Sequence, residues 1–209
     1  MDKANAIFEE FIHRYPCLKG VHIKKAFALL LKSYKEGGKT LVCGNGGSAS
    51  DSEHIIGELM KGFLLRRKLT GSERKRFGSI EGGEEIADQL QRAFPAISLN
   101  SQTSLLTAIG NDISYDMVFA QQVYGYGCAK DVLMALTTSG NSKDVVLAAK
   151  TAKIIGMKII GITGNKPSKI KKICDVCLTL PATETYKVQE LTLPVYHVLC
   201  AMLEKELFE

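Results

Sequence analysis

His54 and Glu58, a histidine and a glutamate four residues apart, are well placed in this sequence to do chemistry. Positions i and i+4 of a helix lie on one face, so an imidazole and a carboxylate would be presented together. Such a pair can transfer protons or bind a metal ion, although an exposed helix ion pair explains the spacing equally well. Of the other three histidines, His13 and His22 are expected at the surface, and His197 lies in the last expected helix. Taken alone, His197 is explained best as a core histidine.

Two polar loops, GNGGS (44–48) and TTSGNS (137–142), each follow a short apolar run and precede a helical pattern. Glycines let backbone amides approach an anion, and a helix N-terminus presents free N–H groups. Two such loops at one end of a sheet predict a phosphate site in which hydroxyls and amides are the donors. The first loop alone could equally be a tight turn capped by Ser48 or Ser50. The sequence lacks GxxxxGK[ST], so a nucleoside triphosphate is not expected.

The elements that must position these residues are short apolar strands alternating with helices. Strands are expected at 40–44, 95–99, 132–137, 158–163 and 176–180, and helices at 48–60, 142–156 and 188–208. This alternation predicts an α/β fold in which a five-stranded parallel sheet is covered by helices on both faces. Two further amphipathic helices are expected within residues 1–36, and the chain 1–209 is expected to form a single domain.

Residues 62–94 interrupt this alternation with a polar, glycine-containing stretch that we interpret as an insertion; 84–94 could be helical. It could be a lid, an oligomer contact, a specificity element or a surface flap. Residues 61–76 have a net charge of +6, so the rest of the chain sums to −1 within a total of +5. Such local basicity suits an anionic small molecule or a solvated flap, and no nucleic-acid partner is expected.

Composition is that of an ordinary globular protein, with 45% hydrophobic and 23% charged residues. No apolar run reaches the ~18 residues of a membrane span, and the N-terminus lacks an apolar signal core, so a cytoplasmic protein without membrane contact is expected. The six scattered cysteines are expected to be reduced and buried. Cys174 and Cys177 form a lone CxxC, which favours two core residues on or beside a strand over a zinc ribbon.

Five motifs in order resemble the sugar isomerase (SIS) domain family and, within it, the phosphoheptose isomerases: GNGGSASDSEHIIGEL, GND (110–112), TTSGNS, KIIGMKIIGITG (153–164) and QELTLPVYH (189–197). The resemblance covers nearly the whole chain except about 62–94. It implies the three-layer SIS sandwich and a homotetramer with active sites between subunits. It also implies conversion of sedoheptulose 7-phosphate to D-glycero-D-manno-heptose 7-phosphate through an enediol.

The resemblance also implies residue roles. Substrate contacts would come from the first loop, the second loop and three further polar residues: Asn45, Gly46, Gly47 and Ser48; Thr137, Thr138, Ser139 and Ser142; Asn111, Asp112 and Gln189. A zinc ion, in members that bind one, would be held by His54, Glu58, Gln189 and His197. Glu58 and His197 would be the catalytic acid–base pair. This pair suits an aldose–ketose interconversion, which needs one base at carbon and one acid–base group at oxygen.

The proposed zinc ligands raise a geometric difficulty. Gln189 and His197 would lie about 12 Å apart along a straight helix, too far for one metal ion. Pro194 has no backbone N–H to donate to a helical hydrogen bond, so the helix could begin or kink there. Alternatively, two subunits could each contribute ligands. We expect at least one of these.

Three departures from the family pattern leave alternatives open. Thr137 replaces a usual serine, Thr192 replaces a histidine of many members, and Lys61-Gly62 replaces the usual glycine–arginine. Lys61 or the basic run could stand in for the missing arginine on the phosphate side. An isomerase of another ketose phosphate and a non-catalytic SIS protein that senses phosphosugars or binds a protein partner remain alternatives. The presence of both Glu58 and His197 favours an enzyme.

Overall fold

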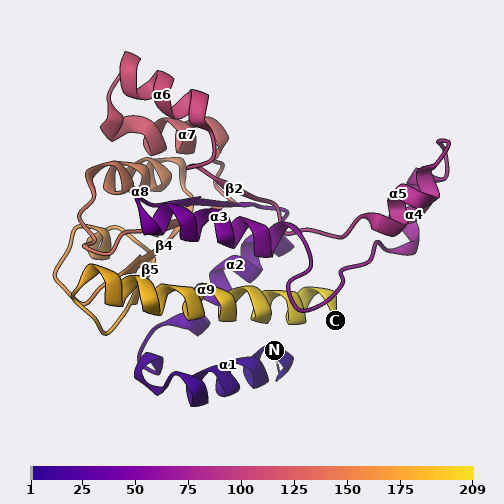
Figure 1. The fold of residues 1–209 in the computed structure, drawn as a ribbon, viewed down its shortest axis with the longest axis horizontal. Helices are drawn as coiled ribbons and strands as arrows, with labels where there is room; N and C mark the ends of the chain where they lie inside the picture. Colours follow the sequence, from indigo (N-terminus) through magenta and orange to yellow (C-terminus); the bar gives the residue numbers. More distant parts are fainter. Residues whose placement is uncertain (1) are drawn as a thin grey trace.

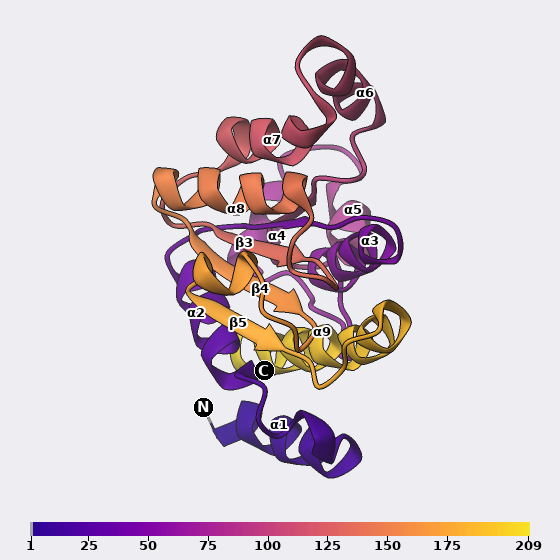
Figure 2. The same cartoon turned by 90° about the vertical axis from the view of Figure 1, so that its left-hand side faces the viewer.

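A five-stranded parallel sheet forms the centre of the molecule (Figures 1 and 2), in a computed structural model that describes residues 2–209. The strands are β1 (Thr40–Cys43), β2 (Ala96–Ser98), β3 (Val132–Leu136), β4 (Lys158–Thr163) and β5 (Val176–Thr179). Their order is β2-β1-β3-β4-β5, and every neighbouring pair is parallel. The α/β class and the five expected strands are therefore confirmed.

Helices cover both faces of this sheet, which makes the three predicted layers. One face packs on α2 (Ile23–Lys35), α3 (Gly47–Met60) and α9 (Thr185–Phe208), and the other on α6 (Thr103–Asp112), α7 (Val118–Tyr126) and α8 (Lys143–Ile155). Side chains alternate between the two cores: Val42 faces the first, whereas Leu41 and Cys43 face the second. Helix α1 (Asp2–Arg14) lies outside α9 (Figure 1).

The strand order reverses between β1 and β3, and this reversal decides where a ligand can bind. In open parallel sheets the crevice at such a switch point, beyond the carboxyl ends of the strands, is the usual binding site. The loops that follow β1 and β3 are residues 44–46 and 137–142. The two polar loops of the sequence therefore meet at the switch point.

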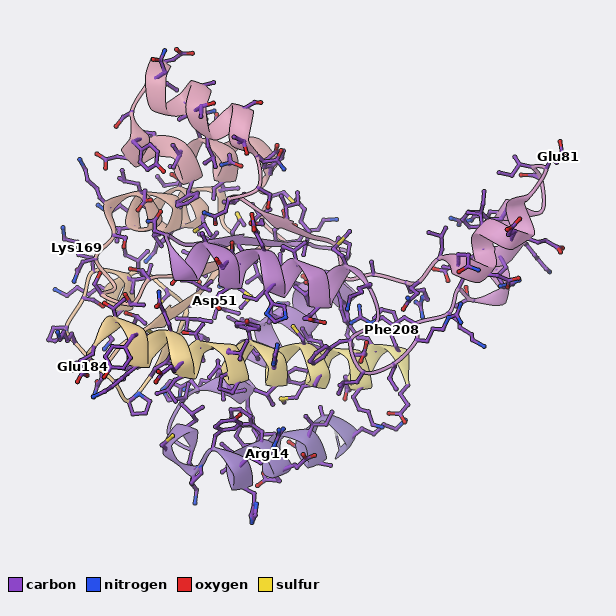
Figure 3. All side chains as sticks on the ribbon, viewed as in Figure 1. Arg14, Asp51, Glu81, Lys169, Glu184 and Phe208 are labelled. Atoms are coloured by element: carbon purple, nitrogen blue, oxygen red, sulfur yellow. The ribbon has the colours of Figure 1, made fainter. Side chains whose placement is uncertain are left out.

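Residues 68–91 form an arm that projects away from the three layers, with Glu81 near its tip (Figures 1 and 3). It contains α4 (Gly71–Phe77) and α5 (Gly83–Gln89). A capping box between Thr70 and Glu73 begins α4, and Arg74 pairs with Asp88 of α5 at 2.7 Å. The expected helix at 84–94 stops at Gln89 because the chain then turns back, and Gln91 bridges Lys68.

Four sequence-based expectations need correction. Helix α9 begins at Thr185 and continues through Pro194, so a helix start near this proline was wrong. The basic run is not wholly solvated, because Arg67 is buried. Helices α4, α6 and α7 and the 3₁₀ turns were not predicted; these turns are Pro16–Leu18, Tyr115–Met117 and Ile170–Lys172.

The fourth expectation to be corrected is that all six cysteines are buried. Only Cys43 and Cys200 are buried, whereas Cys17 is exposed. None of the six is paired in a disulfide within residues 2–209. Cys177 lies on β5 and Cys174 just before it, as expected, but both are only partly buried. Over the same described residues, no helix is both long and apolar enough to cross a membrane.

Candidate active site

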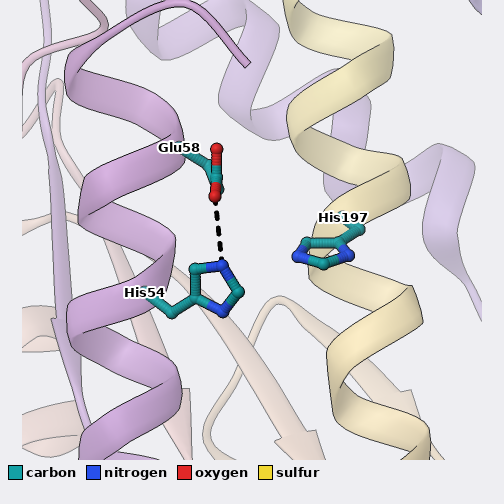
Figure 4. A group of neighbouring side chains, drawn as sticks. All are labelled: His54, Glu58 and His197. Carbon is teal, nitrogen blue, oxygen red and sulfur yellow. Dashed lines mark hydrogen bonds and ion pairs between the residues drawn. The ribbon is translucent and has the colours of Figure 1, made fainter. Parts of the chain in front are cut away.

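Helices α3 and α9 lie side by side and bring His54, Glu58 and His197 together (Figures 1 and 4). One potential ligand atom from each of the three residues lies within 4.8 Å of the others. Within α3, Nε2 of His54 is 3.0 Å from Oε1 of Glu58, and the Glu58 side chain is only 13% exposed. An exposed pair of this spacing contributes about 0.3–0.5 kcal/mol, too little to explain why a carboxylate is placed against a second histidine.

The His54 ring is held in place from its other nitrogen. The Tyr196 hydroxyl lies 2.8 Å from Nδ1 of His54 and donates to Oδ1 of Asp51 at 3.4 Å. Tyr196 is 1% exposed, and burial raises the pKa of its hydroxyl, which therefore stays protonated. Partners of this kind fix the orientation of a ligating or catalytic histidine.

His197 offers an imidazole that is neutral at neutral pH. Burial is the main cause that lowers its pKa; His54 lowers it further, while Glu58 acts in the opposite direction. Its Nε2 atom is buried and finds no hydrogen-bond partner within residues 2–209. Such an unpartnered nitrogen suits a bound ligand, because leaving a buried polar atom unpaired costs about 1–3 kcal/mol.

Lys61, one of the candidates to replace the missing arginine, turns towards this cluster. Its Nζ lies 3.3 Å from Oε2 of Glu58 and 3.1 Å from the carbonyl oxygen of Gly62. The first of these contacts places its charge beside the Glu58 carboxylate, at the opposite end of α3 from the first loop. The rest of the basic run belongs to the arm and its base, also away from that loop (Figure 1).

The first loop is folded tightly around its glycines. Gly46 has φ +56°, a value that favours glycine, and the chain then turns into α3 with Ser48 N donating to Asn45 O at 3.0 Å. Asn45, Gly46 and Gly47 are exposed, whereas Ser48 is buried. The loop therefore leaves glycine backbone accessible at the N-terminus of a helix, as an anion site requires.

The second loop adjoins the first. Asn45 donates to Oδ2 of Asp144, in the first turn of α8, at 2.7 Å. Within the second loop, the hydroxyls of Thr137 and Ser142 lie 3.0 Å apart, and Ser139 Oγ accepts from the Asn141 amide at 3.2 Å. Thr138 is partly exposed. The structure thus brings the predicted loop residues into one polar region.

Gln189 belongs to this region and not to the histidine cluster. A Cβ atom added at Gly47 would lie 2.5 Å from Nε2 of Gln189, so the glutamine amide packs directly on the first loop. Gly47 precedes His54 by seven residues, about 10 Å along α3. Within one chain, the structure therefore groups three of the four predicted metal ligands and leaves Gln189 apart.

Asn111 and Asp112 are likewise not brought to the site. They lie at the end of α6, in the layer on the far side of the sheet (Figure 2), and both are exposed. The Asn111 amide bonds to the neighbouring Asp112 carboxylate at 2.8 Å. Within the described residues, this bond joins the two side chains to each other and neither is hydrogen-bonded to the histidine cluster or to the polar loops.

Sequence reasoning missed three residues that organise the site: Asn100, Asp144 and Tyr196. Asn100 exchanges two hydrogen bonds with the Gly44 backbone, at 2.7 and 3.2 Å. Its position just after a strand, at the same sheet edge as the glycine loop, could have revealed it. Asp144 follows the second loop by two residues, a similar signal. Tyr196 stands among apolar residues, and its contact with His54 has no sequence signal.

Comparisons with known proteins agree with this architecture. The sequence pattern of the SIS domain family matches residues 2–93 and 85–164. The phosphoheptose isomerase of Clostridium acetobutylicum is 40% identical over 186 residues, which cover 89% of this chain and 83% of that protein.

Two solved structures are similar over almost the whole chain. The phosphoheptose isomerase of Neisseria gonorrhoeae superposes with a TM-score of 0.73 at 33% identity and covers 97% of both chains. That of Francisella tularensis has a TM-score of 0.75 at 27% identity and covers 97% of this chain and 96% of that one. The chain therefore belongs to the SIS domain family and, within it, to the phosphoheptose isomerases.

Proposed function

We propose that this enzyme interconverts sedoheptulose 7-phosphate and D-glycero-D-manno-heptose 7-phosphate. The observation that carries the proposal is the carboxylate–imidazole cluster of Glu58 and His197, held on two adjacent helices. Helix α3 begins at the glycine loop and carries Glu58 in its last turn. A helix that links an anion-binding loop to an acid–base pair suits a phosphorylated sugar.

An aldose–ketose interconversion moves one proton between adjacent carbons through an enediol and another between the two oxygens. Glu58 has the carboxylate that would take the proton from carbon and return it to the neighbouring carbon. His197, neutral because burial lowers its pKa, can accept a proton from a sugar hydroxyl and donate it to the carbonyl oxygen. The Lys61 ammonium lies 3.3 Å from Oε2 of Glu58 and keeps a positive charge beside this carboxylate.

The phosphate group would bind at the switch point of the sheet. Amides of the first loop and hydroxyls of Thr138, Ser139 and Ser142 would be its donors. The bond from Asn45 to Asp144 holds the two loops together, which reduces the ordering cost of binding.

The residues present also fit a zinc ion. Two imidazoles and one carboxylate form the donor set of many catalytic zinc sites, which keep a further position open for water or substrate. The unpartnered Nε2 atom of His197 and the Tyr196 contact that orients His54 suit such a role. His54, Glu58 and His197 would hold the ion, with Gln189 of another subunit as the predicted fourth ligand. When bound, zinc would polarise the sugar carbonyl.

Zinc binding can be tested without turnover. Protein freed of metal by dialysis against EDTA is expected to bind about one Zn²⁺ per chain, measured by competition with a chromophoric chelator. His54→Asn is expected to weaken binding by at least about tenfold, because one ligand is lost. His13→Asn, an exposed histidine on α1, is the control and should bind like the wild type. Equal affinities for all three proteins would contradict the site.

A homotetramer with sites between subunits is part of the proposal. The exposed Asn111 and Asp112, far from the cluster of their own chain, and the distance from Gln189 to His54 both favour a site completed by a second subunit. Light scattering would measure the mass of the assembly. Cysteines without disulfides favour a reducing compartment, so we propose the cytoplasm.

The test of the reaction is a phosphorus NMR time course with sedoheptulose 7-phosphate, with and without added zinc. A growing heptose 7-phosphate signal is the expected result. If folded, zinc-loaded protein forms no product, sedoheptulose 7-phosphate is not its substrate. Shorter ketose phosphates would then be assayed, and failure of these as well would favour a sensor or adaptor.

A further inference from the structure

Arg67 and Glu204 form an ion pair that is closed off from solvent beside the proposed catalytic helices. Their side chains are 0% and 1% exposed, and Arg67 Nε lies 2.6 Å from Glu204 Oε1. Arg67 stands where the arm joins the body, and Glu204 lies on α9. A buried pair of charges is costly to desolvate, so its geometry and its other partners decide what it does.

The remaining donors of Arg67 bind the end of α3. Its Nη1 donates to Leu59 O at 2.7 Å and its Nη2 to Glu58 O at 3.0 Å. Helix α3 ends at Met60, so these carbonyls belong to the last turn and have no partner within the helix. A positive charge at a helix C-terminus is also favourable. Arg67 thus holds the peptide group of the proposed catalytic glutamate itself.

Glu204 anchors the other side of this contact. It follows His197 by seven residues, two helical turns, and so lies on the same face of α9. Its carboxylate also accepts the backbone amides of Phe63, Leu64 and Leu65 at 2.8, 2.7 and 3.0 Å. The ion pair therefore joins the end of the helix that carries Glu58 to the helix that carries His197.

We propose that Arg67 is a positioning residue that fixes Glu58 opposite His197 by clamping the end of α3 to α9. The inference deepens the proposed function, since it rests on Glu58 and His197 being the acid–base pair. The Arg67 guanidinium is suited to this role because its N–H groups point outward in one plane. They therefore reach one carboxylate and two carbonyl oxygens at once. A lysine ammonium keeps the charge but does not reproduce this geometry.

The test compares Arg67→Lys with Arg92→Met. Arg92 is a matched control because its guanidinium lies 4.8 Å from the centre of the Phe208 ring, the ring that Arg67 also covers at 5.0 Å, and its ion-pair partner is Glu73. Steady-state kinetics would give kcat and KM, and hydrogen exchange would report on residues 55–61 and 194–204. Circular dichroism and thermal melts would confirm that each variant is folded at the assay temperature.

We expect Arg67→Lys to lower kcat by about 10- to 100-fold with KM within about twofold, because small misplacements of reacting groups cost that much. Exchange in the last turn of α3 should also be faster, whereas Arg92→Met should change neither quantity. A wild-type kcat for folded Arg67→Lys, or an equal loss in Arg92→Met, would overturn the proposal. If Arg67→Lys does not fold, kcat and hydrogen exchange of Glu204→Gln are compared with those of Arg92→Met instead.

Failure of the proposed function would be visible separately, as no turnover by the wild type. Hydrogen exchange then tests, without an activity assay, whether Arg67 holds the end of α3 to α9. Unchanged exchange at residues 55–61 in Arg67→Lys would overturn the clamp whatever the substrate is.

Discussion

Glu58→Gln is expected to lower kcat for sedoheptulose 7-phosphate by about 10²- to 10⁴-fold, the usual contribution of a positioned general base. Glutamine keeps the size of the side chain and can still bond to His54, so the fold should persist. It has no carboxylate to take a proton from carbon. Initial rates from phosphorus NMR would measure the loss, and a thermal melt would show that the variant is folded.

Glu53→Gln provides the matched control for this change. Glu53 lies on the same helix, is exposed, and accepts a hydrogen bond from the Ser101 hydroxyl at 3.0 Å, away from the cluster. It should retain the wild-type rate. If Glu58→Gln kept more than about a tenth of the wild-type kcat, a catalytic-base role would be excluded, because that loss is smaller than proton transfer accounts for.

His197→Asn is expected to lower kcat by a similar factor of about 10²- to 10⁴-fold, and the double variant with Glu58→Gln should be little worse than the poorer single variant. The two side chains act on one proton-transfer sequence, so removing either interrupts it. When two groups act as a unit, the losses of activity on removing each of them do not add in the double variant. Single-turnover rates of the two single variants and the double variant would measure the coupling.

His22→Asn is the control for the histidine change, since His22 is exposed at the start of α2. It is expected to behave as the wild type. Independent losses, in which the double variant falls by the product of the two single factors, would mean that Glu58 and His197 do not share a reaction step.

Much of the fold could be predicted because its signals are local. The strand Lys158–Thr163 carries three isoleucines in six residues between Gly156 and Gly164, and both its ends match the expectation. The two polar loops follow strands directly, so their meeting at one sheet edge follows from parallel pairing alone. The pair of His54 and Glu58 is visible in the helical spacing.

The rest depends on contacts between residues far apart in the chain. Arg67 and Glu204 are separated by 137 positions, and nothing in either segment indicates the other. The same holds for Tyr196 and His54, 142 positions apart. Pro194 was misleading because a proline inside a helix is usually disfavoured, whereas here it is buried within a continuous α9 and its packing outweighs the lost hydrogen bond.

The arm leaves and rejoins the body at almost the same place: the Arg92 amide donates to Arg67 O at 2.7 Å, and Lys68 bridges Gln91. Since both ends are fixed together, the length of chain between them can change at small entropic cost to the body. The segment from Gly78 to Gly82 is thus a natural insertion point for a fluorescent or affinity module. Such a fusion would leave the proposed active site intact and would make the arm a handle for labelling the enzyme.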